Sequence, residues 1–272
     1  MTEPEPAPPI GSFAALGDSF TEGLNDPYPD GGFLGWADRV AAVLAEQVLG
    51  FRYANLAIRG NLVHQVVAEQ VPRAVELAPD LVSLAAGGND ILRGADVDEL
   101  AAQFEGAVAA PAAAGSRVLI FTGFDPHTFP VIRLLRGRIA AYDMHLRAIA
   151  DEHGCSLVDL WSMRVLRDPR AWSPDRLHLT SEGHRRVALR ACDVLGLPAA
   201  GDWRAPLPVS GGAVNRPVKG SAWLTARGRD ARWVWEYAGP WVRRRLTGAS
   251  SGDGLRPKRP DLLPVLPDRV SR

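Results

Sequence analysis

The sequence has little cysteine, no long apolar run and no net charge. Its two cysteines, Cys155 and Cys192, are far apart and match no metal-binding spacing, so we expect two small buried side chains. No apolar run approaches the roughly 18–20 residues that span a bilayer. Lys and Arg together number 31, as do Asp and Glu. This balance argues against a basic nucleic-acid binder.

Several localisation and cofactor signals are also missing. The segment Met1–Pro6 is acidic and rich in proline, without the basic and apolar regions of a signal peptide. We therefore expect a cytoplasmic protein. Neither a P-loop nor a G-x-G-x-x-G motif follows the first predicted strand, and no His, Cys and Asp cluster has metal-ligand spacing. The sequence therefore predicts a protein that needs no metal and no cofactor.

The zero net charge is the sum of two unlike parts. Residues 1–200 carry 17 basic and 25 acidic side chains, whereas residues 201–272 carry 14 basic and 6 acidic ones and five of the eight Trp. Such asymmetry points to a contact of the basic part, either internal or with an anionic partner. We expect a flexible N-terminal arm over residues 1–10, a domain over 11–200 and a basic, Trp-rich extension over 201–272.

Short apolar segments alternate with segments that have helical periodicity. This alternation predicts a parallel sheet covered on both faces, a three-layer α/β/α fold. Asp96 and Thr180 are suitable N-caps, and Pro72 predicts an interruption of one helix. The expected strands are 12–16, 51–58, 81–86, 117–122 and 155–160, and the expected helices are 36–49, 62–77, 96–114, 130–152 and 180–195.

Polar side chains follow the predicted strands at the edge where such sheets bind ligands. They lie in Gly17–Gly23 after the first strand, Arg59–Asn61 after the second and Gly87–Asp90 after the third. A fourth group, Asp175–His178, precedes the last helix. These segments supply Ser, Asn, Asp and His to one rim of the sheet.

This set of residues fits acyl transfer. A serine hydroxyl needs a base such as histidine to remove its proton, and the histidine needs a carboxylate that fixes its tautomer. Ser19, His178 and Asp175 are the candidates for these three roles. The tetrahedral intermediate needs hydrogen-bond donors, for which the backbone N–H groups of Ser19 and Gly60 and the side-chain amide of Asn89 are the candidates.

At these residues the chain resembles the GDSL (SGNH) hydrolases over about residues 12–196. The matching blocks are Gly17-Asp18-Ser19-Phe20, Gly60, Gly87-Gly88-Asn89-Asp90 and Asp175-Arg176-Leu177-His178, in the order of the family. The resemblance implies a flavodoxin-like sheet of five parallel strands. It also implies Ser19 as nucleophile, His178 as base and Asp175 as the partner that orients it.

Two positions depart from the commonest pattern of the family. Phe20 stands where Leu is usual, and Leu179 stands where Pro often follows the histidine. Neither side chain supplies chemistry, so we expect them to affect packing or the shape of the acyl pocket. We expect Asp18 and Asp90 to hydrogen-bond the loops that hold Ser19 and Asn89.

The expected function is hydrolysis of a small-molecule ester, carboxylesterase- or lipase-like, with a small or medium acyl group. Alternatives with the same residues are an acyltransferase, a lysophospholipase, a thioesterase or a carbohydrate acetylesterase. A non-catalytic binding protein is a further alternative, against which the intact Ser19, Asp175 and His178 argue.

One segment of the extension is a candidate for contact with another surface. Over residues 232–246, Trp233, Tyr237 and Trp241 recur at helical spacing beside a cluster of arginines. This segment could pack on the acidic domain, join a second subunit in a homo-oligomer, or lie on an anionic surface. Residues 248–272 are rich in Gly, Pro and Arg, and we expect them to be extended or disordered.

Overall fold

A computed structural model describes residues 9–28, 31–129, 131–208 and 251–265. Within these ranges the chain forms one six-stranded sheet, of order β5-β4-β3-β1-β2-β6. Strands β1 to β5 are parallel, and β6 pairs antiparallel with β2. The five predicted parallel strands and their flavodoxin-like order are confirmed. The bounds are β1 Ser12–Gly17, β2 Arg52–Asn55, β3 Leu81–Ala85, β4 Arg117–Phe121, β5 Ser156–Val158 and β6 Arg259–Pro264.

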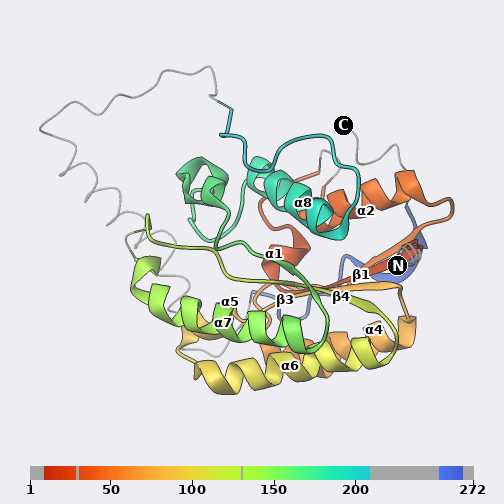
Figure 1. Cartoon of the computed structure of the whole chain (residues 1–272), viewed down its shortest axis with the longest axis horizontal. Helices are drawn as coiled ribbons and strands as arrows, with labels where there is room; N and C mark the ends of the chain where they lie inside the picture. Colours follow the sequence, from red (N-terminus) through yellow and green to blue (C-terminus); the bar gives the residue numbers. More distant parts are fainter. Residues whose placement is uncertain (1–8, 29–30, 130, 209–250, 266–272) are drawn as a thin grey trace, which may run out of the picture.

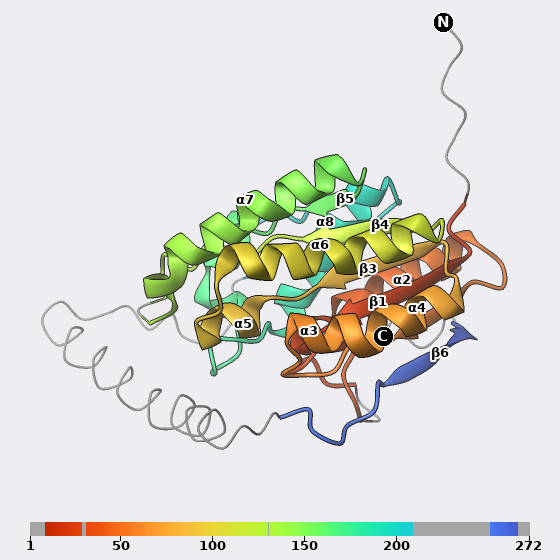
Figure 2. The same cartoon turned by 90° about the horizontal axis from the view of Figure 1, so that it is seen from below.

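Helices cover both faces of this sheet (Figure 1). One face carries α2 and α8, and the other carries α4, α6 and α7 (Figure 2). This is the three-layer arrangement that the sequence predicts. The helices are α1 Ser19–Glu22, α2 Gly35–Gln47, α3 Val63–Gln65, α4 Val71–Leu77, α5 Gly88–Arg93, α6 Val97–Ala113, α7 Arg136–Glu152 and α8 Ser181–Leu195.

Two apolar layers hold the helices on the sheet. All six residues of β1 are buried, because a central parallel strand is covered on both sides. Trp36 of α2 and Val187 of α8 belong to the layer on one face, and Phe104 of α6 and Leu146 of α7 to the layer on the other. The apolar periodicity of these helices therefore faces the sheet, as the sequence predicts.

The interruption predicted at Pro72 is present. The predicted helix 62–77 consists of α3, a π-helical turn over Val66–Gln70 and α4, with Pro72 in the first turn of α4. Proline has no N–H to donate to the preceding turn. The wider turn just before Pro72 lets the helical path continue past it.

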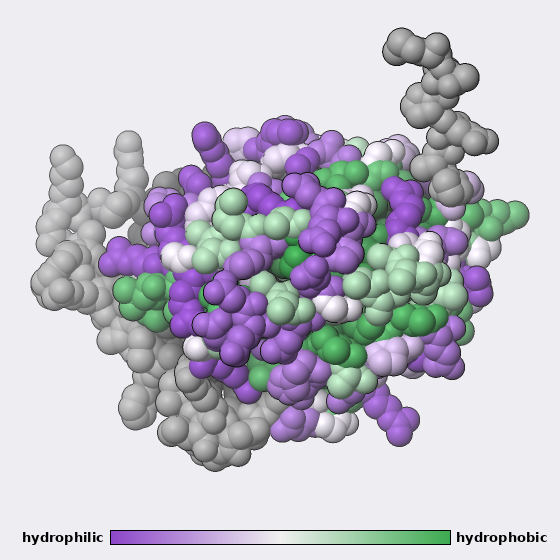
Figure 3. Space-filling model, turned by 60° about the horizontal axis from the view of Figure 1, so that its bottom comes forward, coloured by the Kyte–Doolittle hydropathy of each residue, from purple (hydrophilic) through white to green (hydrophobic). Residues whose placement is uncertain are grey.

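The outer surface is mixed in character. On the side covered by α4, α6 and α7, hydrophilic residues are interspersed with hydrophobic ones (Figure 3). This pattern is expected of amphipathic helices whose apolar faces pack inward. Among the helices of the described ranges, none combines the length and apolarity required to cross a membrane.

The edge strand β6 corrects the expectation for the end of the chain. The sequence predicts no strand after residue 200, yet Arg259–Pro264 pairs with β2. Pro260 and Pro264 lack the N–H groups of a regular ladder, which obscures a strand pattern in the sequence. Proline is compatible with an edge strand, where one side of the strand has no partner.

Trp203, at the start of the extension, packs on the domain. Trp203 Nε1 donates a hydrogen bond to Asp193 at 3.0 Å, and the Arg190 and Arg204 guanidiniums lie 4.7 and 4.0 Å from the Trp203 ring centroid. Tryptophan faces attract such cations. The predicted amphipathic segment 232–246 and the first eight residues of the N-terminal arm lie outside the described residues.

Substitution of a residue in the sheet core should lower the stability of the fold. Leu119 of β4 is fully buried, whereas Leu49 is fully exposed. Leu119→Ala should lower the free energy of unfolding by about 2–5 kcal/mol, because it removes buried methyl groups and leaves a cavity. Leu49→Ala is the matched control and should change it by less than about 0.5 kcal/mol. Urea denaturation of the three proteins measures the difference, and equal losses would contradict the assigned burial.

Candidate active site

A tight turn after β1 brings Ser19 to the edge of the sheet. Gly17 has φ +143°, and a Cβ at this position would lie 2.2 Å from the carbonyl oxygen of Ala85, so only glycine fits. Asp18 then caps α1, and its side chain accepts a hydrogen bond from Phe20 N at 3.0 Å. Helix α1 can therefore begin at Ser19, directly after the strand.

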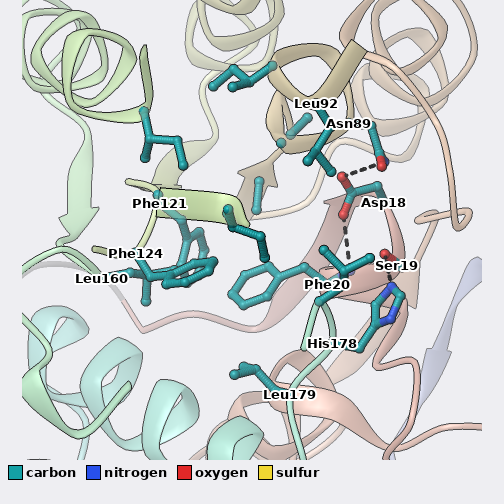
Figure 4. Close-up of a pocket in the computed structure, with 18 of the residues that line it drawn as sticks. Asp18, Ser19, Phe20, Asn89, Leu92, Phe121, Phe124, Leu160, His178 and Leu179 are labelled. Atoms are coloured by element: carbon teal, nitrogen blue, oxygen red, sulfur yellow. Dashed lines mark hydrogen bonds between the residues drawn. The ribbon is translucent and has the colours of Figure 1, made fainter. Parts of the chain in front are cut away.

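Ser19 and the residues before α8 form a chain of two hydrogen bonds. His178 Nε2 lies 3.0 Å from Ser19 Oγ (Figure 4). His178 Nδ1 lies 2.7 Å from Asp175 Oδ2. The imidazole thus lies between a hydroxyl and a carboxylate, the arrangement by which serine nucleophiles are activated.

Asp175 is fixed and kept ionised by its neighbours. Its Oδ1 accepts hydrogen bonds from the backbone N–H groups of Leu177 and His178, both at 3.0 Å. Burial alone would raise the pKa of Asp175, but the hydrogen bond and charge of His178 and these backbone donors outweigh it and hold the pKa below its ordinary value. The carboxylate therefore stays ionised throughout the neutral pH range.

Asn25 makes a contact that the sequence did not predict. Its Nδ2 donates to Asp175 Oδ2 at 2.8 Å. Asn25 has φ +69°, a conformation that asparagine tolerates better than most residues. The two residues are 150 positions apart and share no motif, so no local signal relates them.

The candidate donors lie beside Ser19. Gly60 follows β2 in a turn with φ +77°, and Asn89 is the second residue of α5. In the described part of the chain, the backbone N–H groups of Ser19 and Gly60 donate to no protein acceptor. The Asn89 amide donates to Asp18 Oδ2 at 3.0 Å and to the carbonyl oxygen of Asn61 at 3.1 Å.

Asp18 and Asp90 hold the surrounding loops, as expected. Asp18 joins the start of α1 to Asn89 through its two oxygens, and Asp90 accepts from the backbone N–H of Val63 at 3.2 Å. Burial raises the pKa of Asp18 to about 6, against the opposing effects of the Phe20 hydrogen bond and the His178 charge. Above that pH its carboxylate is available as an acceptor for the Asn89 amide.

A cavity of about 450 Å³ opens beside this group. The five candidate residues all line it: Ser19, Gly60, Asn89, Asp175 and His178. Away from the polar group the wall is mostly aromatic and aliphatic (Figure 4). The apolar lining includes Phe20, Leu92, Phe121, Phe124, Ile132, Leu135, Ile139, Leu160, Leu166, Trp172 and Leu179.

The two unusual positions of the motif blocks both face this cavity. The Phe20 ring packs 5.7 Å from the ring centroids of both Trp36 and Phe121. Leu179 is buried and lines the cavity on the opposite side of Phe20 from Asn89 (Figure 4). Both side chains therefore shape the pocket, the effect expected from the sequence.

Other titratable groups are separate from the hydrogen-bonded chain. His184 of α8 is buried, and burial lowers its pKa to about 4, so the ring is neutral in the physiological range. Among the described residues, Glu105, Glu152 and His153 have ligand atoms close enough together to hold a metal ion. None of these three lines the cavity.

Comparison with known proteins agrees with the fold and the motif blocks. The model of the GDSL-like lipase/acylhydrolase family matches residues 15–186. A search of curated proteins gives no match.

Solved structures share the fold at low sequence identity. LAE5, an α/β hydrolase enzyme from the metagenome of Lake Arreo, Spain, is 23% identical over 68% of this chain and 95% of its own, with a TM-score of 0.59. TesA is 23% identical over 68% of this chain and 97% of its own, with a TM-score of 0.58. Axe2, an acetylxylan esterase from Geobacillus stearothermophilus, is 24% identical over 71% of this chain and 95% of its own, with a TM-score of 0.59.

The family match spans most of the predicted domain and contains Ser19, Gly60, Asn89, Asp175 and His178. The resemblance noted from the motif blocks is thereby confirmed. This chain belongs to the GDSL-like lipase/acylhydrolase family and is an ester hydrolase.

Proposed function

We propose that the protein cleaves esters through an acyl-enzyme on Ser19, with His178 as general base and Asp175 as its orienting partner. The observation that carries this proposal is the unbroken path from Ser19 Oγ to His178 at 3.0 Å and on to Asp175 at 2.7 Å. The ionised Asp175 favours the tautomer in which His178 Nε2 accepts a proton.

The reaction then proceeds in two halves. Ser19 Oγ attacks the ester carbonyl carbon while its proton passes to His178 Nε2. The tetrahedral intermediate collapses, and the alcohol leaves with the proton from His178. Water attacks the acyl-Ser19 carbonyl, again losing a proton to His178, and the acid departs as Ser19 regains its hydrogen.

We assign the oxyanion site to the N–H groups of Ser19 and Gly60 and to the Asn89 amide. Support comes from the two backbone N–H groups, which have no protein acceptor in the described part of the chain, and from the position of all three residues on one cavity. Both amide hydrogens of Asn89 have acceptors, Asp18 Oδ2 and the Asn61 carbonyl oxygen, so one of these bonds gives way when Asn89 donates to the oxyanion. The two backbone donors need no such exchange, and donors fixed in advance stabilise developing charge most effectively.

The cavity supports an acyl chain longer than acetyl as the substrate. Beyond the polar group, its wall is built from aromatic and aliphatic side chains. Each methylene that moves from water into such an apolar site contributes about 0.8 kcal/mol. We therefore assign the substrate class as esters of medium-chain fatty acids.

The nucleophile is tested by Ser19→Ala. Loss of the attacking oxygen should abolish hydrolysis of p-nitrophenyl acetate and labelling by a fluorophosphonate. Ser162→Ala, at an exposed serine outside the cavity, is the matched control and should retain both. A Ser19→Ala protein with wild-type hydrolysis would overturn the proposed function.

The oxyanion site is tested by Asn89→Ala. Removing one donor should lower kcat by roughly 100–1000-fold, with a smaller effect on KM, because the interaction strengthens only as charge develops on the oxygen. Steady-state kinetics with p-nitrophenyl acetate measures both constants, and the melting temperature checks that the variant is folded. A kcat within threefold of wild type would remove Asn89 from the assignment.

Acyl-chain selection is tested by filling the pocket. Leu135 lines the cavity, whereas the adjacent Leu134 is 80% exposed. Wild-type kcat/KM should rise from acetate to octanoate esters, and Leu135→Trp should lower it at least about tenfold for octanoate while changing acetate by less than about threefold. Leu134→Trp is the control and should change neither. A panel of p-nitrophenyl esters decides, and equal effects on both esters would contradict the assigned acyl site.

A further inference from the structure

The C-terminal strap, which we define as residues 251–265, returns to the active-site edge from outside the family match. Its edge strand β6, drawn in blue in Figure 2, pairs with β2. At its start, Ser251 lines the same cavity as Ser19 and His178. The matched region ends at residue 186, so the strap is an addition to the shared domain that reaches its catalytic edge.

Lys258 anchors the strap beside the end of α1. Its Nζ donates to the carbonyl oxygens of Glu22, Phe33 and Leu34 at 2.8, 2.9 and 3.1 Å. It also lies 3.0 Å from Asp38 Oδ1. The side chain is 22% exposed. A cation at the carboxyl end of a helix satisfies its terminal carbonyl groups, and here it also ties α1 to the following loop.

Glu22 connects the end of α1 to the Gly60 turn. Its carboxylate accepts the backbone N–H of Arg59 at 3.0 Å and forms an ion pair with the Arg59 guanidinium. The same guanidinium lies 5.0 Å from the Phe33 ring centroid. The Ser19 helix and the Gly60 turn are therefore joined through Glu22, whose own carbonyl oxygen is held by Lys258.

Gly252 contacts the peptide group that carries the Gly60 donor. A Cβ at residue 252 would lie 2.1 Å from the carbonyl oxygen of Arg59 and 2.8 Å from Ile58 Cγ2. The Arg59 carbonyl and the Gly60 N–H belong to one planar peptide unit. A displacement of that oxygen therefore turns the Gly60 N–H as well.

We propose that the strap is a positioning element of the active site, in which Gly252 and Lys258 fix the direction of the Gly60 N–H relative to Ser19. Gly252 supports the Arg59–Gly60 peptide from its carbonyl side, while Glu22, held in place by Lys258, binds the Arg59 N–H. A shift of about 1 Å in a catalytic donor can cost about 100-fold in rate. This inference rests on the proposed oxyanion role of Gly60.

The test uses the full-length chain and two pairs of variants. Gly252→Ala places a methyl against Arg59, and its control is Gly106→Ala, where an added Cβ meets nothing within 4 Å. Lys258→Met removes the ammonium but keeps an apolar stem, and its control is Arg256→Met, at an exposed cation of the same strap. Active sites are first counted by fluorophosphonate labelling carried to completion, so that kcat refers to folded, reactive Ser19.

We expect Gly252→Ala and Lys258→Met to lower kcat per labelled site for p-nitrophenyl acetate at least about tenfold, with KM changed by less than about threefold. Both controls should remain within about twofold of wild type. Because Lys258→Met adds no clash, its kcat per labelled site tests the positioning role of the strap if Gly252→Ala fails to fold. The proposal is overturned if kcat per labelled site is unchanged, since the strap would then contribute to folding alone. Such a result beside an inactive Ser19→Ala would leave the proposed function intact.

Discussion

The hydrogen bond between Ser19 and His178 joins residues 159 positions apart, and it depends on the parallel arrangement of the sheet. Parallel strands end at a common edge, so the turn after β1 and the loop before α8 reach the same place. Gly17 makes this possible at close range, because any side chain there would meet the carbonyl oxygen of Ala85. The chemistry of the site thus follows from backbone packing at the strand ends.

Around this bond, buried and half-buried carboxylates organise the loops. Asp18 joins α1 to Asn89, Glu22 joins α1 to Arg59, and Asp175 hydrogen-bonds to His178. Each carboxylate accepts two or more hydrogen bonds, which offsets the cost of removing charge from water. The loops at this edge are consequently held by polar contacts, while the apolar layers hold the helices on the sheet. Polar contacts therefore hold the loops of the site, and apolar contacts hold the helices and sheet that carry them.

Much of this architecture was predictable from local signals. The five parallel strands, the main helices and the caps at Asp96 and Thr180 correspond to the structure because apolar periodicity and capping act over a few residues. The edge strand β6 was not predictable, since Pro260 and Pro264 mask its pattern and its partner β2 lies some two hundred residues earlier. The contact of Asn25 with Asp175 was missed for the same reason, a long separation without a shared motif.

The sequence by itself determined the residue types, their order and their placement after strands, which suffice to identify the family and the candidates Ser19, Gly60, Asn89, Asp175 and His178. Tertiary structure alone decided that these five line one cavity, that its far wall is apolar, and that Gly252 and Lys258 reach the same edge. The physical reason is the separation along the chain of the residues that interact. Turn chemistry and periodicity are encoded locally, whereas the shape of a cavity and the direction of a peptide N–H depend on which distant segments pack against them.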